Sequence, residues 1–401
     1  MEYNTNGQGA EDEGRAGRRG NGSLYDRLHG IRDPRKAKGK IYGLVMLLMV
    51  IFLAKLCGKD KPGEIADWAH NHAAELADLL RLRSQRMPSH STIRRVFQSM
   101  VDENELNQLA QGYSQHKSEE IGEVLALDGK TLRGTRVAGH EAGDHVLSVY
   151  DVTHQHVVAQ VTVDSRENEI VAAPRILETV SVAGKVITGD AIHTQRAISA
   201  QIVAHGGHYL WPVKENQPQL HEAIEALFAP QTPIPGFGKI PNDFLTAQTV
   251  DLGHGRLEQR TIQTSTSLNE YLDWPHVGQV YRLERRFQWL RRGEVYKTSS
   301  EVEFGITSLP RDQASPAQVL HARRAHWQIE TALHYRRDVT FHEDATRMTI
   351  GPAGRILATI HNLVIALIKR VGFTNAAQAR RYFEGHLCEA MSLLVAIPNL
   401  S

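Results

Sequence analysis

The chain has little cysteine and no long uninterrupted hydrophobic run, and each shortage excludes a class of protein. Two cysteines, Cys57 and Cys388, cannot build a disulfide framework or a cysteine-rich zinc site. The first twenty residues lack the apolar core that a signal peptide needs. Residues 41–54 carry no acidic or basic side chain, but a bilayer span takes roughly 20 apolar residues. We therefore expect a buried helix there, no membrane partner, and a cytoplasmic location.

Charge is balanced almost completely, with 46 Lys and Arg against 45 Asp and Glu. The net charge of +1 and the hydrophobic fraction of 41% exclude a mostly disordered chain. A length of 401 residues suffices for two or three domains with cores of their own. Balanced charge says nothing about nucleic acid, because only the distribution of basic side chains matters for binding it.

The amino-terminal part divides into two segments. Residues 1–22 are rich in Gly, Asn and charge, which predicts a disordered tail. Residues 23–118 repeat apolar side chains at helical spacing, for example at Ile65, Trp68 and Leu76, and Ser89 can cap a further helix. This pattern predicts an all-helical amino-terminal domain.

Residues 119–229 alternate strand-like and helix-like segments. Strands are expected at residues 124–127, 145–152, 156–163, 185–190 and 208–213, and helices at 170–180, 194–206 and 217–228. Three strands followed by alternating helices and strands are typical of an α/β, ribonuclease H-like domain, in which the first and fourth strands are central neighbours. The pattern alone leaves other α/β folds open.

Residues 230–312 lose the helical segments and alternate polar and apolar side chains, which predicts an inserted antiparallel β-domain. A long helix is expected to begin near Ser315. Residues 313–401 are therefore assigned, together with 119–229, to the α/β domain.

Three carboxylates are candidates for chemistry. Asp128 and Asp190 are each expected to end an apolar strand, and carboxylates at the ends of neighbouring strands converge. A pair of this kind repels itself unless a cation neutralises it, although a strand-terminal Asp also commonly caps a turn. The third, Glu330, lies in a helix among arginines, where an intrahelical ion pair is the alternative.

Five separated blocks carry a family resemblance: LALDGKTLRG, ITGDAIHTQ, YLWPVKENQ, GHGRLEQR and RAHWQIETALHYRRDVTFHEDATR. Together they resemble the DDE transposases of bacterial insertion sequences, specifically the ISAs-type group that includes the H-repeat-associated proteins. The resemblance extends from Asp33 to about Val371. The sequence departs from that pattern at Thr331, Tyr335 and Arg337, which puts details of DNA contact in doubt rather than the chemistry.

The resemblance implies that Asp128, Asp190 and Glu330 are a catalytic triad holding two Mg²⁺ or Mn²⁺ ions. Hard cations of this kind prefer carboxylate, water and phosphate oxygens. It further implies a nucleoid-associated enzyme that binds the ends of its element, cleaves double-stranded DNA there and transfers the 3′-ends to target DNA. Synapsis of two ends makes a homodimer on DNA the expected assembly.

Two other readings stay open. A zinc hydrolase would use His326, Glu330 and His334, which are spaced four apart on one helix, but the two aspartates would then have no part in it. The other reading is a catalytically decayed or domesticated DNA-binding protein, or a metal-dependent nuclease, of the same fold. An intact set of three carboxylates argues against decay.

Basic and imidazole side chains near these features are candidate DNA contacts. For each, an ordinary solvated or structural role is the alternative, and for His326 and His334 that alternative is support of a carboxylate. The candidates are Arg94, Arg95, Lys130, Arg133, Lys214, Arg256, Arg260, Arg324, His326 and His334.

Overall fold

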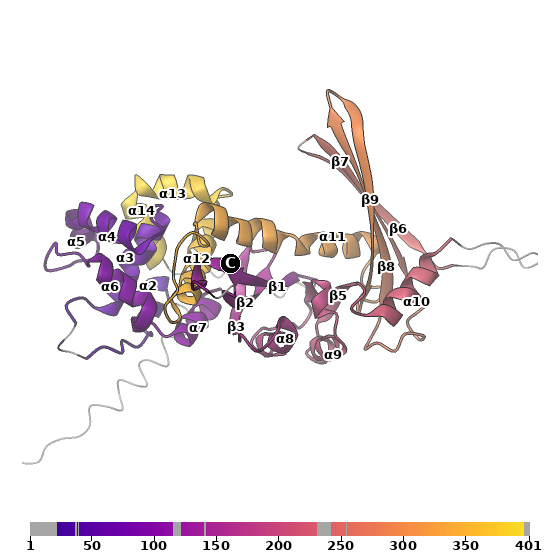
Figure 1. The fold of residues 1–401 in the computed structure, drawn as a ribbon, viewed down its shortest axis with the longest axis horizontal. Coiled ribbons are helices and arrows are strands. Elements are labelled where there is room, and N and C mark those ends of the chain that lie inside the picture. The colour runs from indigo at the N-terminus through magenta and orange to yellow at the C-terminus, as the bar shows by residue number, and fades with distance from the viewer. Residues whose placement is uncertain are drawn as a thin grey trace, which may run out of the picture.

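The computed structural model describes residues 22–396, apart from residues 37, 39, 115–121, 140–141, 231–241 and 254. The predicted disordered tail thus lies outside the described residues except for Gly22, as does the predicted boundary at 118. The predicted boundary between residues 229 and 230 lies directly before the undescribed residues 231–241. The molecule is elongated: helices gather at one end, a twisted sheet lies in the middle, and long strands project at the other end (Figure 1).

The amino-terminal segment is helical, as its periodicity predicts. The helices are α2 (Leu24–Leu28), α3 (Leu44–Leu56), α4 (Pro62–Asn71), α5 (Ala73–Leu79), α6 (His90–Arg95) with a π-helical turn at Val96–Met100, and α7 (Glu103–Ser114). Helix α3 is buried on nearly all sides, so the charge-free run is a core helix. Ser89 caps α6 by accepting a hydrogen bond from the Thr92 amide, as expected. None of the described helices combines the length and apolarity that crossing a membrane requires.

Five strands build the first half of the sheet: β1 (Val124–Leu132), β2 (Asp144–Asp151), β3 (His156–Val163), β4 (Val186–Gly189) and β5 (His208–Val213). They lie in the order β3-β2-β1-β4-β5, so β1 lies beside β4 as the sequence predicts, and the two strands pair in parallel. Helices α8 (Glu169–Glu178), α9 (Arg196–Ala204) and α10 (Pro218–Phe228) connect the later strands.

Successive residues of β1 face two different cores. Leu125 and Leu127 pack with the residues of α8 and α9, whereas Val124 and Ala126 pack with the helical end of the molecule. This alternation follows from the two-residue period of a strand. Because both faces are covered, β1 is apolar at four consecutive positions, which is why the run was recognisable as a central strand.

The segment predicted as an inserted β-domain extends the same sheet. Its strands are β6 (Leu245–Gly253), β7 (Arg256–Ser265), β8 (Gln279–Arg291) and β9 (Glu294–Thr307). β9 pairs antiparallel with β5, so that nine strands run continuously in the order β3-β2-β1-β4-β5-β9-β8-β7-β6. The far ends of β7, β8 and β9 project away from the body (Figure 1).

The carboxyl-terminal part begins with α11 (Pro316–His326), which lies along the sheet toward the helical end (Figure 1). Two π-helical segments continue it, Ile329–His334 and Arg336–Thr340, followed by α12 (Ala353–Arg370), α13 (Ala376–Glu384) and α14 (Leu387–Val395). Helices α13 and α14 pack against α3, and α14 also contacts α2. Both ends of the chain therefore contribute to one helical core.

Candidate active site

Asp128 and Asp190 lie at the same level of neighbouring strands. Leu127 is paired with Gly189 in the parallel register, and each aspartate is the next residue along its chain. The expectation that Asp128 ends its strand is wrong, because β1 continues to Leu132 and Asp128 lies opposite Ser148 of β2. Strand β2 is long enough to pair with the residues of β1 that follow Asp128, as far as Leu132. Asp190 does directly follow β4.

Glu330 belongs to the π-helical segment Ile329–His334, which contacts β1. Glu330 is exposed, whereas its apolar neighbour Ile329 is buried. A π-helical turn changes which side chains of a helix share a face, and such turns are frequent at functional sites. Here it accompanies an arrangement in which the helix presents His326 and His334, one on each side of Glu330, to the two aspartates.

Each histidine contacts a different aspartate. His326 Nε2 lies 3.4 Å from Asp190 Oδ1, and His334 Nδ1 lies 3.4 Å from Asp128 Oδ2. Both imidazoles are largely buried, with side-chain exposures of 2% and 14%. The zinc-hydrolase reading needs the two histidines and Glu330 to converge on one point, whereas the structure directs each imidazole to a separate carboxylate.

The two aspartates differ in protonation behaviour. Burial, followed by the charges of Asp190 and Glu169, raises the pKa of Asp128 to about 8. The pKa of Asp190 is instead lowered, mainly by its contact with His326, and Asp190 is more exposed. A negative charge on Asp128 is therefore costly in the protein alone.

His334 does not supply the missing positive charge. Burial is the main cause that lowers its pKa to about 3, and the nearby charges of Arg337 and Lys130 lower it further. The imidazole is neutral at physiological pH. Asp128 thus faces acidic groups without a cationic imidazole beside it, which is the electrostatic situation that a bound metal cation relieves.

Glu169, the first residue of α8, is a candidate that the sequence analysis missed. It contacts His145 Nε2 at 2.8 Å and His193 Nε2 at 3.1 Å. Burial alone raises the pKa of Glu169, but its contacts with the two imidazoles lower it to about 2. A Cβ atom on Gly129 would lie 2.2 Å from Glu169 Oε1 and 2.6 Å from His145 Nε2, so a larger residue beside Asp128 would displace these side chains. No local motif marks this cluster, because its members come from separate segments of the chain.

The candidate DNA contacts around the triad fall into different environments. Lys130 is buried, and its ammonium group lies 2.6 Å from Asp338 Oδ2, so it links β1 to the helix of Glu330. Arg133 is exposed and lies beside Asp344. Lys214 is also exposed, and its charge contributes to the lowered pKa of Asp190.

The candidates on the extended sheet form an ion-pair network. Arg260 contacts both Asp251 and Glu258, with a distance of 2.7 Å from Arg260 Nη2 to Glu258 Oε2. Arg256 lies 3.3 Å from the same glutamate, and Arg324 of α11 lies 2.9 Å from Asp251. These arginines therefore connect β6, β7 and α11 through carboxylates.

Arg94 and Arg95 are exposed on α6, while Ile93 and Val96 beside them are buried. The structure thus brings His326 and His334 to the aspartates and leaves this arginine pair in the amino-terminal helical segment. The buried side chains of Ile93 and Val96 hold this part of the chain in the core, and the two arginines face outward, as the amphipathic pattern predicts.

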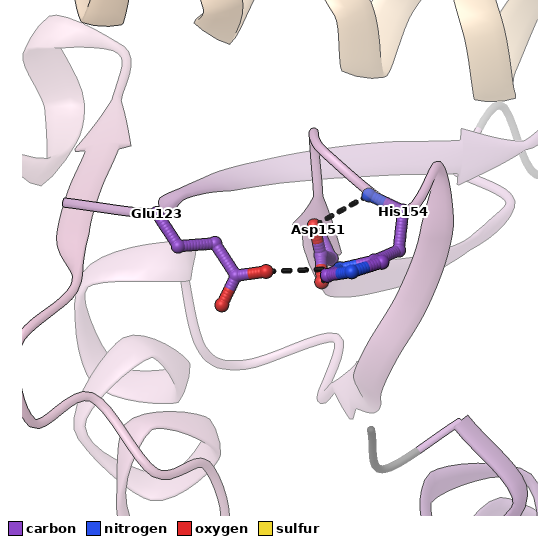
Figure 2. Close-up of side chains that lie close together, drawn as sticks. All are labelled: Glu123, Asp151 and His154. Atoms are coloured by element: carbon purple, nitrogen blue, oxygen red, sulfur yellow. Dashed lines mark hydrogen bonds and ion pairs between the residues drawn. The ribbon is translucent and has the colours of Figure 1, made fainter. Parts of the chain in front are cut away.

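A second acidic cluster lies at the opposite end of β1. The ligand atoms of Glu123, Asp151 and His154 lie within 4.8 Å of one another, and Figure 2 shows both carboxylates directed at His154. Lys185 Nζ lies 2.6 Å from Glu123 Oε2, so a lysine already supplies positive charge there. The pKa of His154 is raised by both carboxylates although its burial acts in the opposite direction. This cluster is an ion-pair network at the start of the central strand, and it is distinct from the triad.

Comparison with known families matches two parts of the chain. Residues 25–113 match the family described as DDE_Tnp_1-associated, and residues 120–367 match the family described as Transposase DDE domain. The second match covers more than half of the chain. The boundary between the matches falls within the segment where the sequence pattern changes from helices to strands.

Curated relatives agree with these matches. The chain is 30% identical over 350 residues to "Putative transposase YncI" of Escherichia coli O157:H7, covering 86% of this chain and 87% of the relative. It is 26% identical over 352 residues to "H repeat-associated putative transposase YhhI" of Escherichia coli strain K12, covering 86% and 90%. Among solved structures, the piggyBac transposase synaptic complex with hairpin DNA aligns with a TM-score of 0.43 and 11% identity, covering 91% of this chain and 77% of that one.

The family matches therefore agree with the resemblance that the five sequence blocks indicate. The relatives span the helical amino-terminal part as well as the sheet. The chain belongs to the bacterial DDE transposases of the H-repeat group, enzymes that cleave DNA and transfer its strands.

Proposed function

We propose that Asp128, Asp190 and Glu330 are the catalytic triad of a ribonuclease H-like domain. The domain would cleave DNA at the ends of its own insertion sequence and transfer the 3′-ends to target DNA. One observation carries the proposal. The two aspartates lie at the same level of the adjacent parallel strands β1 and β4, and the helix of Glu330 contacts β1. The order β3-β2-β1-β4-β5 supports the ribonuclease H-like assignment.

Membership of the DDE family implies dependence on a divalent metal, and the residues present fit one. Three carboxylates offer the hard oxygen ligands that Mg²⁺ and Mn²⁺ prefer, and the raised pKa of Asp128 marks negative charge that lacks a cationic partner. We infer that the three side chains hold two such ions. When bound, the ions supply activation of the attacking oxygen and stabilisation of the leaving oxygen in an in-line displacement.

The chain's own residues set the geometry of that site. His326 and His334 position the carboxylates of Asp190 and Asp128, and the neutral state of His334 allows it to do so without competing with a cation for the site. Lys130 holds the helix of Glu330 against β1 through Asp338. A buried cluster in which Glu343 accepts from Arg337 at 2.7 Å fixes the same helix from its other end.

The remaining parts of the proposal concern DNA. Recognition of one end among many competing sites needs contacts that read bases or DNA shape, and the triad must also accept unrelated target DNA. We therefore assign end recognition to Arg94 and Arg95, and backbone contact to exposed Lys214 and Arg133. Pairing of two ends favours a homodimer on DNA, which places the working enzyme on the nucleoid.

Cleavage by triad variants tests the proposal. Asp128→Ala, Asp190→Ala and Glu330→Ala are each expected to keep DNA binding and to lose cleavage of DNA that carries the inverted repeats flanking the gene. Mg²⁺ and Mn²⁺ should support cleavage by the unaltered protein, and Ca²⁺ should support binding only. Glu178→Ala, which removes an exposed carboxylate at the end of α8, is the matched control.

Two results would contradict the proposal. The first is full Mg²⁺-dependent cleavage by a folded Glu330→Ala protein. The second is stoichiometric zinc that persists through purification and is lost in His326→Ala or His334→Ala, which would favour the zinc hydrolase. Cleavage without strand transfer of precut ends would indicate a nuclease.

A further inference from the structure

A cavity of about 660 Å³ adjoins the helix of Glu330 on a face that the triad does not use. Thr331, the residue after Glu330, lines it, and so does Tyr335 one turn later. The opposite wall is the amino-terminal end of α13, and the loop after α3 closes one side at Lys59. We call this space the basic cavity. It brings together three segments that are distant in the sequence.

The charges that line the basic cavity are mostly positive. Four lining side chains are cationic and one is acidic: Lys59, Arg336, Arg380 and Arg381 against Glu384. Two of the cations are neutralised, since Lys59 lies 2.6 Å from Glu384 and Arg380 lies 2.6 Å from Asp60. Among the described residues, Arg336 and Arg381 have no carboxylate partner within ion-pair distance. The cavity therefore keeps a net positive potential.

The backbone adds to that potential. Helix α13 begins at Ala376, which lines the cavity together with Ala377. The Asn375 side chain caps the amide of Gln378, so the amides of the first turn that it does not cap remain at the positive end of the helix dipole. Helix amino-termini combined with arginine are a common way to bind phosphate oxygens.

An aromatic ring distinguishes the basic cavity from a site for a free anion. Tyr335 is 59% exposed although it is flanked by buried and half-buried neighbours. Arg336 donates a hydrogen bond to the Thr374 carbonyl, but neither it nor Arg381 has a carboxylate partner among the described residues. An exposed ring beside such arginines suits a nucleic-acid strand, because the ring packs against a base or sugar while the guanidinium groups meet the phosphates. An inorganic phosphate would leave the ring unused.

We propose that the basic cavity binds a backbone phosphate of a DNA strand that passes Glu330. Arg381 and the first turn of α13 contact the phosphate, Arg336 contributes charge, and Tyr335 packs against the adjoining nucleoside. This inference rests on the proposed function, because it takes the Glu330 helix as part of the DNA-cleaving site. The strand could be that of the element's end or that of the target, and both present the same phosphate chemistry.

Binding measured without cleavage tests the assignment. Fluorescence anisotropy with chelator present would compare a duplex carrying the flanking inverted repeat with a random duplex across a salt series. Arg381→Ala should weaken binding roughly threefold and lower the salt slope by about one, as expected for loss of one phosphate contact. Arg381→Glu should weaken it further, and Arg336→Gln and Tyr335→Ala should weaken it as well.

Arg166→Ala is the matched control, since it removes an exposed arginine from the loop between β3 and α8, which does not line the cavity. A loss confined to the inverted-repeat duplex assigns the cavity to the element's end, and an equal loss on both duplexes assigns it to a path shared with the target. Unchanged affinity and salt slope in Arg381→Glu on both duplexes would overturn the inference. In that case loss of cleavage in Glu330→Ala would still support the proposed function. Weaker binding by Arg381→Glu together with full cleavage by Glu330→Ala would reject the triad and keep the cavity as a DNA contact.

Discussion

Replacing Asp128 by Asn should stabilise the metal-free protein, and increasingly so as the pH rises. The Asp128 side chain is only 16% exposed, and its pKa is raised from 3.8 to about 8 by burial and by the acidic groups around it. The folded state therefore keeps a proton that the unfolded state releases near its ordinary pKa. Asn has the same shape and no charge to bury.

The sign and size follow from proton linkage. The folded protein binds the proton of such a carboxyl group more tightly than the unfolded chain does. This preference adds its full amount to the free energy of unfolding below the pKa of the unfolded chain, and that amount declines as the pH rises toward the pKa of the folded state. The wild-type protein thus loses stability relative to Asp128→Asn by about 1.4 kcal/mol per pH unit within this window. Between about pH 5 and pH 7 the difference should grow by roughly 2–3 kcal/mol.

Urea denaturation with chelator present, at several pH values across that window, measures this difference directly. Asp67→Asn, an exposed carboxylate on α4, is the control and should show no such trend. Added Mg²⁺ should restore stability to the wild-type protein and have little effect on the variant, because binding to the folded state alone is stabilising. A wild-type to variant difference that is the same at every pH would refute the reasoning.

Three further changes probe the framework of the site. Glu343→Gln should destabilise the fold by about 3–5 kcal/mol in urea denaturation, because it leaves the Arg337 guanidinium buried without its carboxylate. Gly305→Ala should lower the thermal midpoint with a cost of about 1–3 kcal/mol, since the added Cβ would lie 2.2 Å from the Tyr281 ring at the junction of the two halves of the sheet. Lys130→Ala should slow cleavage while DNA affinity stays unchanged, because the Lys130 ammonium group pairs with Asp338 of the helix that carries Glu330. An equal loss of DNA affinity would show that Lys130 contacts phosphate instead.

Features that depend on neighbouring residues were predictable from the sequence. The charge-free run forms the buried helix α3, Ser89 caps α6, and the five expected strands occur with β1 beside β4. Each has a local cause: a continuous apolar run, a hydroxyl before a helix, or a short β-branched segment between turns. The same local signals placed Asp190 directly after its strand and Glu330 within the helix that begins near Ser315.

Long-range pairing decided the rest. Strand β1 passes beyond Asp128 because β2 is long enough to pair with the polar residues after it, and β9 joins β5, so the predicted insertion continues the central sheet. Glu169 lies against Gly129, and Lys130 turns to Asp338, only because separate segments meet there. The basic cavity likewise needs α3, the helix of Glu330 and α13 together. Local periodicity determines which segments are helices and strands, whereas the partners of a charged side chain depend on contacts between residues far apart in the chain, and these the tertiary structure alone supplies.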